Sequence, residues 1–340
     1  MQYSVTNMVK KVDLQQAVDF IEKSDRILIT THTKPDGDAI GCLMAVCNML
    51  KTIGKKVKPL LLSPAPDWYR FLLTEKVPVL GGDIQIEDLK TGRFGEFDLV
   101  MILDTNSPGQ LPKFEDFLKQ NNKPVLVIDH HRTSDGLGAV ELIEADAAAT
   151  ALVVLELFKY TGWEITEKIA EALFVGIATD TGWFQFNNTD GRVFSACAEL
   201  IDFGIKPSEV YHKLYENFSK PRFMLMIAML NTFKLDLNDQ FATMHITRHD
   251  FERTGATYAD SENLINECRR ISTVDTTALF IELDDGRIRC SLRSKGAVDV
   301  GEIANVFGGG GHKMAAGTFV YGPMENAQRL IFEEVSKRFS

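Results

Sequence analysis

Apolar runs of strand length recur along the first half of the chain, and patterns with helical spacing lie between them. Four such runs occupy residues 26–31, 99–103, 125–128 and 172–178. A helical pattern covers 38–50, a further strand-like stretch covers 56–62, and the alternation continues to about residue 185. This order predicts a mostly parallel sheet with crossover helices on both faces.

The second half of the chain changes its pattern twice. Between about residues 190 and 233 only helical patterns occur, which indicates a linker made of helices. From residue 240 strand and helix patterns alternate again, with Asp284-Asp285-Gly286 as a hairpin turn and an amphipathic helix over 324–339. A chain of 340 residues exceeds one ordinary core. The sequence therefore predicts an α/β protein with a first domain over 1–188, a helical linker over 189–234 and a smaller α/β domain over 235–340.

The composition is that of a globular protein, with 45% hydrophobic and 25% charged residues. No apolar stretch approaches the ~20 residues of a membrane span, and residues 1–5 lack the charged and apolar regions that begin a signal peptide. The 5 cysteines are an odd number without a Cys-x-x-Cys pair, which favours reduced and mostly buried thiols. These features predict a cytoplasmic protein that does not contact a membrane.

The formal net charge of −10 restricts the nucleic acids that the chain could bind. Long nucleic acids bind through a basic track, because the neutralisation of phosphates supplies much of the affinity. A small phosphate compound needs only a metal ion or a few local Arg and Lys residues. The charge therefore argues against a processive nuclease on long duplexes and favours a short substrate.

Metal-seeking side chains follow all four apolar runs. They are His32, Asp36 and Asp38 after the first run, Asp104 after the second, Asp129, His130 and His131 after the third, and Asp180 after the fourth. A single Asp after a strand is usually a turn or helix-cap residue, and adjacent histidines are usually surface residues. Their joint occurrence is different, because the carboxyl ends of strands in open α/β sheets collect ligands. We interpret the four segments as strand ends that build the metal site of a hydrolase.

A run of glycines, 308–311, precedes His312 in the second half of the chain. Each glycine costs backbone entropy on folding, so packing economy does not explain four in succession. Glycines allow a backbone to approach a ligand closely or to form a nest of N–H groups for an anion. The cations Arg289, Arg293 and Lys295 precede the run and could converge on the same anion. The alternative is a flexible turn between two helices.

In their order along the chain these segments resemble the motifs of the DHH phosphoesterase superfamily. The matching stretches are His32-x-x-x-Asp36-x-Asp38, Asp104-Thr105, Asp129-His130-His131 and Thr179-Asp180-Thr181, and Gly308–His312 resembles the glycine-rich motif of the DHHA1 domain. The resemblance spans nearly the whole chain and is nearest to NrnA-type bacterial proteins, which are bifunctional oligoribonucleases and phosphoadenosine phosphate phosphatases. One departure is Cys42, which stands where serine is common.

The resemblance implies a role for each of these residues. Two divalent ions would be held by His32, Asp36, Asp38, Asp104, His130 and Asp180, with Asp104 bridging them. Two imidazoles among four carboxylates favour Mn²⁺ over Mg²⁺ or over zinc in a thiolate site. His131 would face the scissile phosphate as a charge stabiliser or proton donor, so that catalysis would rest on His131 and Asp104. Substrate would be bound by Arg289, Arg293, Gly308, Gly309, Gly310, Gly311 and His312.

The expected function is that of a Mn²⁺-dependent phosphoesterase with its active site in the cleft between the two domains. It would cut short oligonucleotides to nucleoside monophosphates and also accept 3′-phosphoadenosine 5′-phosphate. The alternative enzyme is a phosphodiesterase for cyclic di-AMP or linear di-adenylate. A third interpretation is a nucleotide sensor without hydrolysis, which the intact ligand positions argue against. Because members of the family often dimerise, a homodimer stays open.

Overall fold

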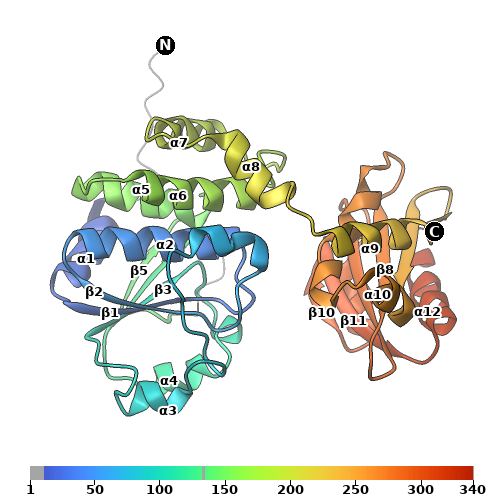
Figure 1. The fold of residues 1–340 in the computed structure, drawn as a ribbon, viewed down its shortest axis with the longest axis horizontal. Helices are drawn as coiled ribbons and strands as arrows, with labels where there is room; N and C mark the ends of the chain where they lie inside the picture. The colour runs from blue at the N-terminus through green and yellow to red at the C-terminus, as the bar shows by residue number, and fades with distance from the viewer. Residues whose placement is uncertain (1–10, 132–134, 340) are drawn as a thin grey trace. The chain divides into compact units, whose positions relative to one another are not determined.

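The computed structural model describes residues 11–131 and 135–339. Residues 1–5, on which the prediction about a signal peptide rests, lie outside the described part. Between Asn217 and Phe218 the chain divides into two compact units, each with its own sheet (Figure 1). Among the residues that the structure describes, no helix is long and apolar enough to span a membrane. The cysteines are buried and free of disulfides, as predicted.

The sheet of the first unit is parallel throughout, with the strand order β2-β1-β3-β4-β5. Its strands are β1 Arg26–Thr31, β2 Lys56–Leu60, β3 Leu99–Leu103, β4 Val125–Asp129 and β5 Val140–Ile143. The central strands β1, β3 and β4 are buried almost completely, because a parallel sheet is covered on both faces. The predicted parallel sheet with helices on both faces is confirmed.

Helices lie on both sides of this sheet (Figure 1). One side carries α1 Lys11–Glu22, α2 Gly37–Thr52, α5 Thr150–Thr161, α6 Glu167–Asp180, α7 Gly191–Ile201 and α8 Pro207–Tyr215, and the other carries α3 Ile86–Lys90 and α4 Phe114–Gln120. Each face of the sheet has its own hydrophobic core, and successive residues of a strand belong to these two cores in turn. In β3, Leu99 and Met101 join the core with α2, and Val100 and Ile102 join the core with α4.

Helix α2 is buried along nearly its whole length, because it lies against both the sheet and α6. Two glycines allow α2 and α6 to pack closely. A Cβ on Gly41 would lie 2.4 Å from Ala172 O, and a Cβ on Gly176 would lie 2.6 Å from Asp38 Oδ1. The packing therefore brings Asp38, in the first turn of α2, close to the last turn of α6, which ends at Asp180.

The prediction of a strand end for the fourth apolar run is wrong, because residues 172–178 lie in the helix α6. This helix packs against α2, α5 and α7, and every residue from Ala172 to Ala178 is buried. A helix that is buried on all sides lacks the polar face that would distinguish it from a buried strand in a sequence pattern. Asp180 is therefore the last residue of a helix.

The second unit is built on a mixed sheet with the strand order β10-β11-β9-β8-β7-β6. Its strands are β6 Lys234–Asp236, β7 Phe241–Ile246, β8 Thr276–Glu282, β9 Arg287–Ser294, β10 Gly310–His312 and β11 Ala315–Tyr321. Strands β7 and β8 are parallel, and the other neighbouring pairs are antiparallel. The predicted hairpin turn at Asp284-Asp285-Gly286 joins β8 to β9.

Helices cover the two faces of this second sheet unequally. They are α9 Lys220–Leu230, α10 Arg248–Thr254, α11 Val300–Val306 and α12 Met324–Ser336, together with the short 3-10 helices Tyr258–Ser261 and Leu264–Arg270. Helices α11 and α12 pack on one face, against alternate residues of β8, β9 and β11. On the other face, α9 and the 3-10 helix Leu264–Arg270 pack on β7 and β8.

The helices of residues 189–234, for which we predict a linker, are divided between the two units. Val193 and Leu200 of α7 and Val210 of α8 belong to the core of the first unit. Leu225 and Met229 of α9 belong to a core of the second unit. Each helix has an apolar face, and burying that face on the adjoining core is favourable.

Candidate active site

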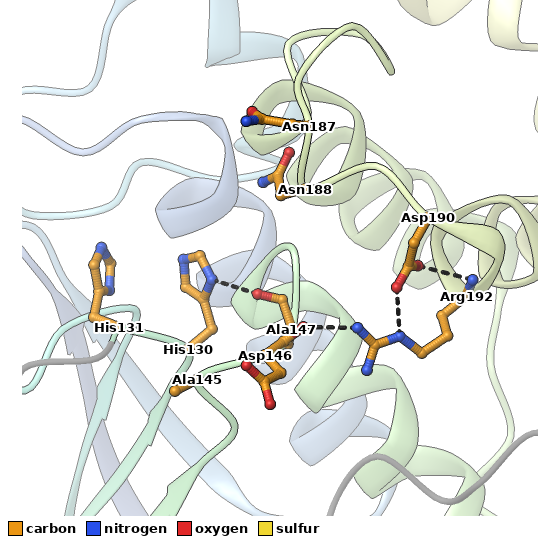
Figure 2. Close-up of a pocket in the computed structure, with 9 residues that line it drawn as sticks. All are labelled: His130, His131, Ala145, Asp146, Ala147, Asn187, Asn188, Asp190 and Arg192. Carbon is orange, nitrogen blue, oxygen red and sulfur yellow. Dashed lines mark hydrogen bonds and ion pairs between the residues drawn. The ribbon is translucent and has the colours of Figure 1, made fainter. Parts of the chain in front are cut away.

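The metal-seeking residues predicted from the sequence lie together at the carboxyl edge of the parallel sheet. They follow β1 (His32), begin α2 (Asp36 and Asp38), follow β3 (Asp104) and β4 (His130 and His131), and end α6 (Asp180). His130 and His131 are neighbours that line one pocket (Figure 2). Ligand atoms within 4.8 Å of one another form three groups: His32, Asp36 and Asp104; Asp38, His130 and Asp180; and Asp104, His130 and His131.

The first group joins His32, Asp36 and Asp104. His32 Nε2 lies 3.5 Å from Asp104 Oδ2 and 3.8 Å from Asp36 Oδ1. His32 Nδ1 lies 2.9 Å from the carbonyl oxygen of Thr33, which can only accept a hydrogen bond. A neutral His32 therefore carries its proton on Nδ1 and offers the lone pair of Nε2 to a metal, the arrangement typical of metal-binding histidines. Asp36 is fixed by its position as the N-cap of α2.

The second group joins Asp38, His130 and Asp180. His130 Nε2 lies 3.3 Å from Asp180 Oδ2, and His130 Nδ1 lies 3.0 Å from the carbonyl oxygen of Ala147. The same tautomer argument therefore applies, and Nε2 of His130 is the free nitrogen. Cys42, one turn further along α2, places its Sγ 3.4 Å from Asp38 Oδ1, so the residue at which the sequence departs from the family contacts this group.

Asp104 occupies the centre of the site and is only 2% exposed. Its Oδ2 faces His32 at 3.5 Å, and its Oδ1 lies 3.8 Å from His130 Nε2, so its two oxygens point toward both groups. The backbone of Asp104 has a φ of 61°, in the left-handed region that residues other than glycine rarely adopt. Its N–H donates to Ile128 O at 2.9 Å, which helps to hold this conformation at the end of β3.

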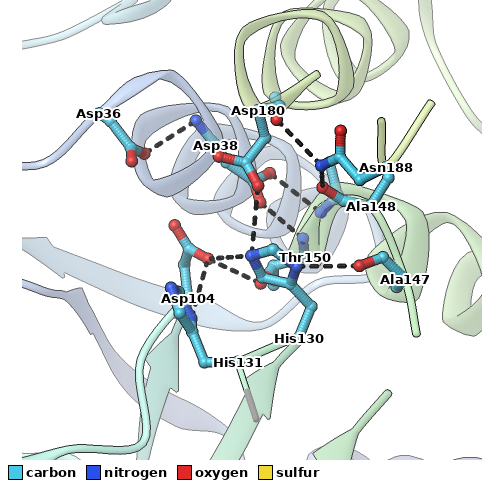
Figure 3. Close-up of polar contacts among 12 residues, drawn as sticks. Asp36, Asp38, Asp104, His130, His131, Ala147, Ala148, Thr150, Asp180 and Asn188 are labelled. Carbon is cyan, nitrogen blue, oxygen red and sulfur yellow. Dashed lines mark hydrogen bonds and ion pairs between the residues drawn. The ribbon is translucent and has the colours of Figure 1, made fainter. Parts of the chain in front are cut away.

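The start of helix α5 holds two of these buried carboxylates (Figure 3). The N–H groups of Thr150 and Ala151 donate to the two oxygens of Asp38 at 2.5 and 3.0 Å. The hydroxyl of Thr150 donates to Asp104 Oδ1 at 2.8 Å. The partial positive charge of a helix N-terminus favours both carboxylates. Thr150 belongs to none of the motifs of the sequence, and it lies 112 positions after Asp38, so no local pattern signals their contact.

Asp129 belongs to none of the three ligand groups and instead positions His131. Its Oδ1 accepts hydrogen bonds from the N–H groups of His130 and His131 and from His131 Nδ1, the last at 2.7 Å. The hydrogen bond to Asp129, opposed by burial, raises the pKa of His131 to about 9. His131 therefore carries a positive charge at neutral pH, which suits a proton donor or a charge stabiliser.

Burial and the proximity of the carboxylates perturb protonation across the site. Burial, followed by the charges of neighbouring carboxylates, raises the pKa of Asp38 well above its usual range and that of Asp180 to about 8. Burial also raises the pKa of Asp104. For His32, burial lowers the pKa, but its hydrogen bonds to Asp104 and Asp36 outweigh burial and raise the pKa to about 11. A cation among these oxygens would relieve their repulsion, so the donor set fits a divalent metal.

A polar pocket of about 640 Å³ lies beside the two histidines (Figure 2). Its lining consists of His130, His131, Ala145, Asp146, Ala147, Asn187, Asn188, Asp190 and Arg192. Asn188 Nδ2 donates to Ala148 O and Asp180 O, both at 3.2 Å, which ties the pocket wall to the metal-seeking cluster. The lining residues beyond the histidines cannot be found from the sequence, because they lie in loops and at the start of α7, without a distinctive pattern.

In the second unit, two of the four glycines have a packing role that the sequence interpretation excludes. A Cβ on Gly309 would lie 2.3 Å from Gly317 O, and a Cβ on Gly311 would lie 2.5 Å from Ala315 O. Both contacts are with β11, against which β10 pairs, so glycine is required there by the close approach of two strands. Gly308 has a φ of +72°, and a Cβ on Gly310 would meet only Asn305 Oδ1 at 3.8 Å.

The predicted substrate-binding cations occupy neighbouring strands. His312 of β10 pairs with Ala315 of β11, and Ala315 pairs with Arg293 of β9, so all three side chains lie on one face. Lys295 instead donates to the carbonyl oxygen of Ile271 at 2.8 Å. Arg289 precedes Arg293 on the same face of β9 and contacts Tyr258 Oη.

Three arginines form a positively charged group in the second unit. In the described part of the chain, no carboxylate lies within ion-pair distance of Arg269, Arg289 or Arg293. Burial lowers the pKa of Arg293, and the charges of Arg269 and Arg289 lower it further. A bound anion would offset this repulsion, so the group is suited to phosphate.

Comparison with known proteins covers both units. Residues 26–177 match the model of the N-terminal domain of the DHH family, and residues 238–340 match the model of the DHHA1 domain. The bifunctional oligoribonuclease and PAP phosphatase NrnA of Thermus thermophilus is 31% identical over 318 residues, which are 92% of this chain and 90% of that protein. The cyclic-di-AMP phosphodiesterase PdeA of Listeria monocytogenes is 28% identical over 323 residues, which are 92% of this chain and 47% of that protein.

Among solved structures, an exopolyphosphatase-related protein from Bacteroides fragilis has the same fold. It superposes with a TM-score of 0.92 and 25% sequence identity, and the match covers 98% of each chain.

Proposed function

The chain belongs to the DHH family and carries a DHHA1 domain, and we propose that it is a Mn²⁺-dependent phosphoesterase for short nucleic acids. It cuts short oligonucleotides to nucleoside monophosphates and dephosphorylates 3′-phosphoadenosine 5′-phosphate. Its likeness to the NrnA of Thermus thermophilus over most of both chains supports this substrate class.

The observation that carries the proposal is the pair of ligand groups that approach each other at Asp104. His32, Asp36 and Asp104 would hold one divalent ion, and Asp38, His130 and Asp180 would hold a second, with Asp104 shared. Bound as a pair, such ions supply an activated water and neutralise charge on the reacting phosphate. Imidazole mixed with carboxylate suits Mn²⁺.

Beyond the ligands, His131 is the residue equipped for catalysis. During hydrolysis the oxygen of water bonds to phosphorus, the ester P–O bond breaks, and the leaving oxygen gains a proton. Asp129 keeps His131 charged and holds its Nδ1, which leaves Nε2 as the proton-bearing nitrogen available to substrate. His131 therefore stabilises the phosphate charge and supplies the proton.

Substrate is held by residues of the second unit as well. Arg289 and Arg293 provide charge-assisted hydrogen bonds to phosphate, and His312 adds a donor on the same strand face as Arg293. Among the glycines 308–311, Gly308 and Gly310 are exposed, and a Cβ on either would meet little or nothing, so an anion can approach this turn closely, although the N–H of Gly308 itself donates to Asn305 O at 3.0 Å.

A second candidate function is hydrolysis of cyclic di-AMP or linear di-adenylate. The likeness to PdeA over 92% of this chain favours it, and the same ligand groups would serve that reaction. The two functions differ in substrate alone, so a direct comparison of substrates separates them.

The test incubates the full-length chain and Mn²⁺ with end-labelled oligonucleotides of about two to twenty nucleotides, 3′-phosphoadenosine 5′-phosphate and cyclic di-AMP. We expect oligonucleotides of a few nucleotides to be cut faster than the longest ones, and the activity to disappear with chelator and with Asp180→Asn. Asp202→Asn, an exposed aspartate outside the ligand groups, serves as the matched control and should retain activity. Faster hydrolysis of cyclic di-AMP than of every oligonucleotide would favour the second candidate, and no hydrolysis of any substrate would refute both.

A further inference from the structure

In the described part of the second unit, one half of a sheet face is not covered by an α-helix. On the side opposite α11 and α12, the residues Leu279 and Ile281 of β8 are buried under α9 and the 3-10 helix Leu264–Arg270. The neighbouring strands β9, β11 and β10 leave their side chains on this side partly or largely accessible, including Phe319 at 44% and Tyr321 at 74% exposure. We call the accessible side of β9, β11 and β10 the open strand face.

The strand register arranges the open strand face in rows, because directly paired residues place their side chains on the same side. The four rows are Arg293, Ala315 and His312; Ser291, Gly317 and Gly310; Arg289 and Phe319; and Arg287 and Tyr321. A rise of about 3.3 Å per residue puts Arg289 roughly 13 Å along β9 from Arg293. The row of Ser291, Gly317 and Gly310 lies between them and leaves a floor of small residues.

The outer two rows combine aromatic rings with guanidinium groups. The guanidinium carbon of Arg287 lies 4.7 Å from the centre of the Phe319 ring. That of Arg289 lies 5.7 Å from the centre of the Tyr258 ring, and Tyr258 is 43% exposed. Arg289 therefore neighbours two accessible aromatic rings, that of Tyr258, which it contacts, and that of Phe319, its pairing partner on the next strand. Exposed aromatic rings grouped around cations mark a binding surface rather than ordinary solvent-facing positions.

The arginines of this face differ from row to row in whether a carboxylate pairs with them. Arg289 and Arg293 lack a carboxylate partner in the described part of the chain, whereas Arg287 is paired with Asp285 at 2.6 Å. The rows of Arg293 and Arg289 are therefore available for phosphate groups, and the row of Arg287 and Tyr321 offers mainly aromatic surface. This order suits a chain of nucleotides, because bases stack on aromatic rings and arginine planes while phosphates seek unpaired cations.

We propose that Phe319, Tyr321 and Tyr258, with Arg289 between them, form a base-stacking subsite for nucleotides beyond the one held at Arg293 and His312. This subsite rests on the proposed function in oligonucleotide hydrolysis and deepens it, because it gives the enzyme a preference for substrate length. A dinucleotide occupies the row of Arg293 and His312, and a longer single strand also covers the rows of Phe319 and Tyr321. Duplexes gain nothing there, because their bases are already stacked.

The expected size of the effect follows from base stacking on aromatic side chains. Loss of one stacked base weakens binding by roughly tenfold, toward the lower end of the range found for such contacts. We expect the wild-type chain to bind a pentanucleotide more tightly than a dinucleotide. Phe319→Ala and Tyr321→Ala should each reduce that difference about tenfold. Both side chains are accessible, so their truncation leaves the core residues of the sheet in place.

The experiment measures dissociation constants of the full-length chain with metal chelated, so that nothing is hydrolysed. The probes are a single-stranded pentanucleotide and a dinucleotide that each contain 2-aminopurine, whose fluorescence falls when the base stacks. Phe223→Ala is the matched control, because Phe223 lies on α9 and is 50% exposed. Quenching that weakens with Phe319→Ala and Tyr321→Ala, but not with Phe223→Ala, supports the subsite.

Equal affinities of wild type and both variants for the pentanucleotide would overturn the subsite, and so would equal losses for both probes. Hydrolysis by the same preparations with Mn²⁺ separates the two proposals. A wild-type chain that cuts oligonucleotides, together with variants that keep the wild-type length dependence, refutes the subsite alone. A wild-type chain that neither cuts nor binds any oligonucleotide refutes the proposed function.

Discussion

Replacing Thr150 by Val removes one hydroxyl from the site and keeps the backbone N–H that Asp38 accepts. The hydroxyl donates to Asp104 Oδ1 at 2.8 Å, and Thr150 and Asp104 are 0% and 2% exposed. A hydrogen bond to a charged group contributes ~1.5–3 kcal/mol, and ~1.4 kcal/mol corresponds to a factor of ten in affinity. We therefore expect Thr150→Val to bind Mn²⁺ about 10- to 100-fold more weakly, which is also the usual effect of losing a residue that orients a ligand.

The loss should fall on metal binding more than on folding of the metal-free chain. Burial raises the pKa of Asp104, so without metal this carboxyl carries a proton more readily than an ordinary aspartate. A bound cation requires the charged carboxylate, and a donated hydrogen bond is strongest to that form. The Thr150 hydroxyl therefore stabilises the metal-bound state more than the metal-free state.

The assay is a Mn²⁺ titration followed by electron paramagnetic resonance, with thermal unfolding of the metal-free proteins beside it. Thr150→Ser retains a hydroxyl and should recover most of the affinity. Thr181→Val is the matched control, because Thr181 is also 0% exposed, but its hydroxyl contacts only backbone groups: it donates to the carbonyl oxygens of Ile177 and Ala178 and accepts from the N–H of Phe184. If Thr150→Val binds Mn²⁺ as tightly as the wild type, the hydroxyl does not orient Asp104 and the reasoning is refuted.

Three further substitutions test the remaining roles. Asp104→Asn should abolish hydrolysis but raise the melting temperature of the metal-free chain, because it removes one buried carboxylate from a repelling cluster; a lower melting temperature would contradict this. His131→Ala should lower turnover by ~10²–10⁴ with unchanged metal content by elemental analysis, and loss of an ion would make His131 a ligand. Arg293→Ala should raise KM for oligonucleotides by about one to two orders of magnitude, measured by initial rates, whereas hydrolysis of a small activated ester that does not reach the second unit should be unaffected.

Much of the first unit follows from its sequence because its strands are buried on both faces. Continuous apolar runs such as 99–103 are typical of a parallel sheet, and the carboxyl ends of such strands meet at one edge. Asp104 and His130 could therefore be assigned to one site without coordinates. The same reasoning fails for 172–178, because a helix buried on all sides shows the same apolar run as a strand.

Contacts between distant segments are what the sequence does not reveal. Thr150 has no motif of its own, and only the packing of α5 against α2 brings its hydroxyl to Asp104. The glycines 309 and 311 show the converse problem, because their pattern indicates a ligand while the close approach of β11 already requires them. Gly309→Val, which the sequence alone suggests as a test of binding, would therefore disturb the pairing of β10 with β11. Arg293→Ala is the cleaner test.

The net charge of −10 describes the whole chain, but nucleic-acid binding depends on how the charges are distributed over the two units. The first unit concentrates carboxylates at a buried site, where burial, followed by the charges of neighbouring carboxylates, raises the pKa values of Asp38 and Asp180. The second unit places Arg269, Arg289 and Arg293 together without carboxylate partners in the described residues. Local attraction of this kind operates over about 10 Å at ordinary ionic strength. It is therefore suited to a few phosphates, and we expect the affinity for oligonucleotides to fall as salt rises, with a slope set by only a few phosphate contacts.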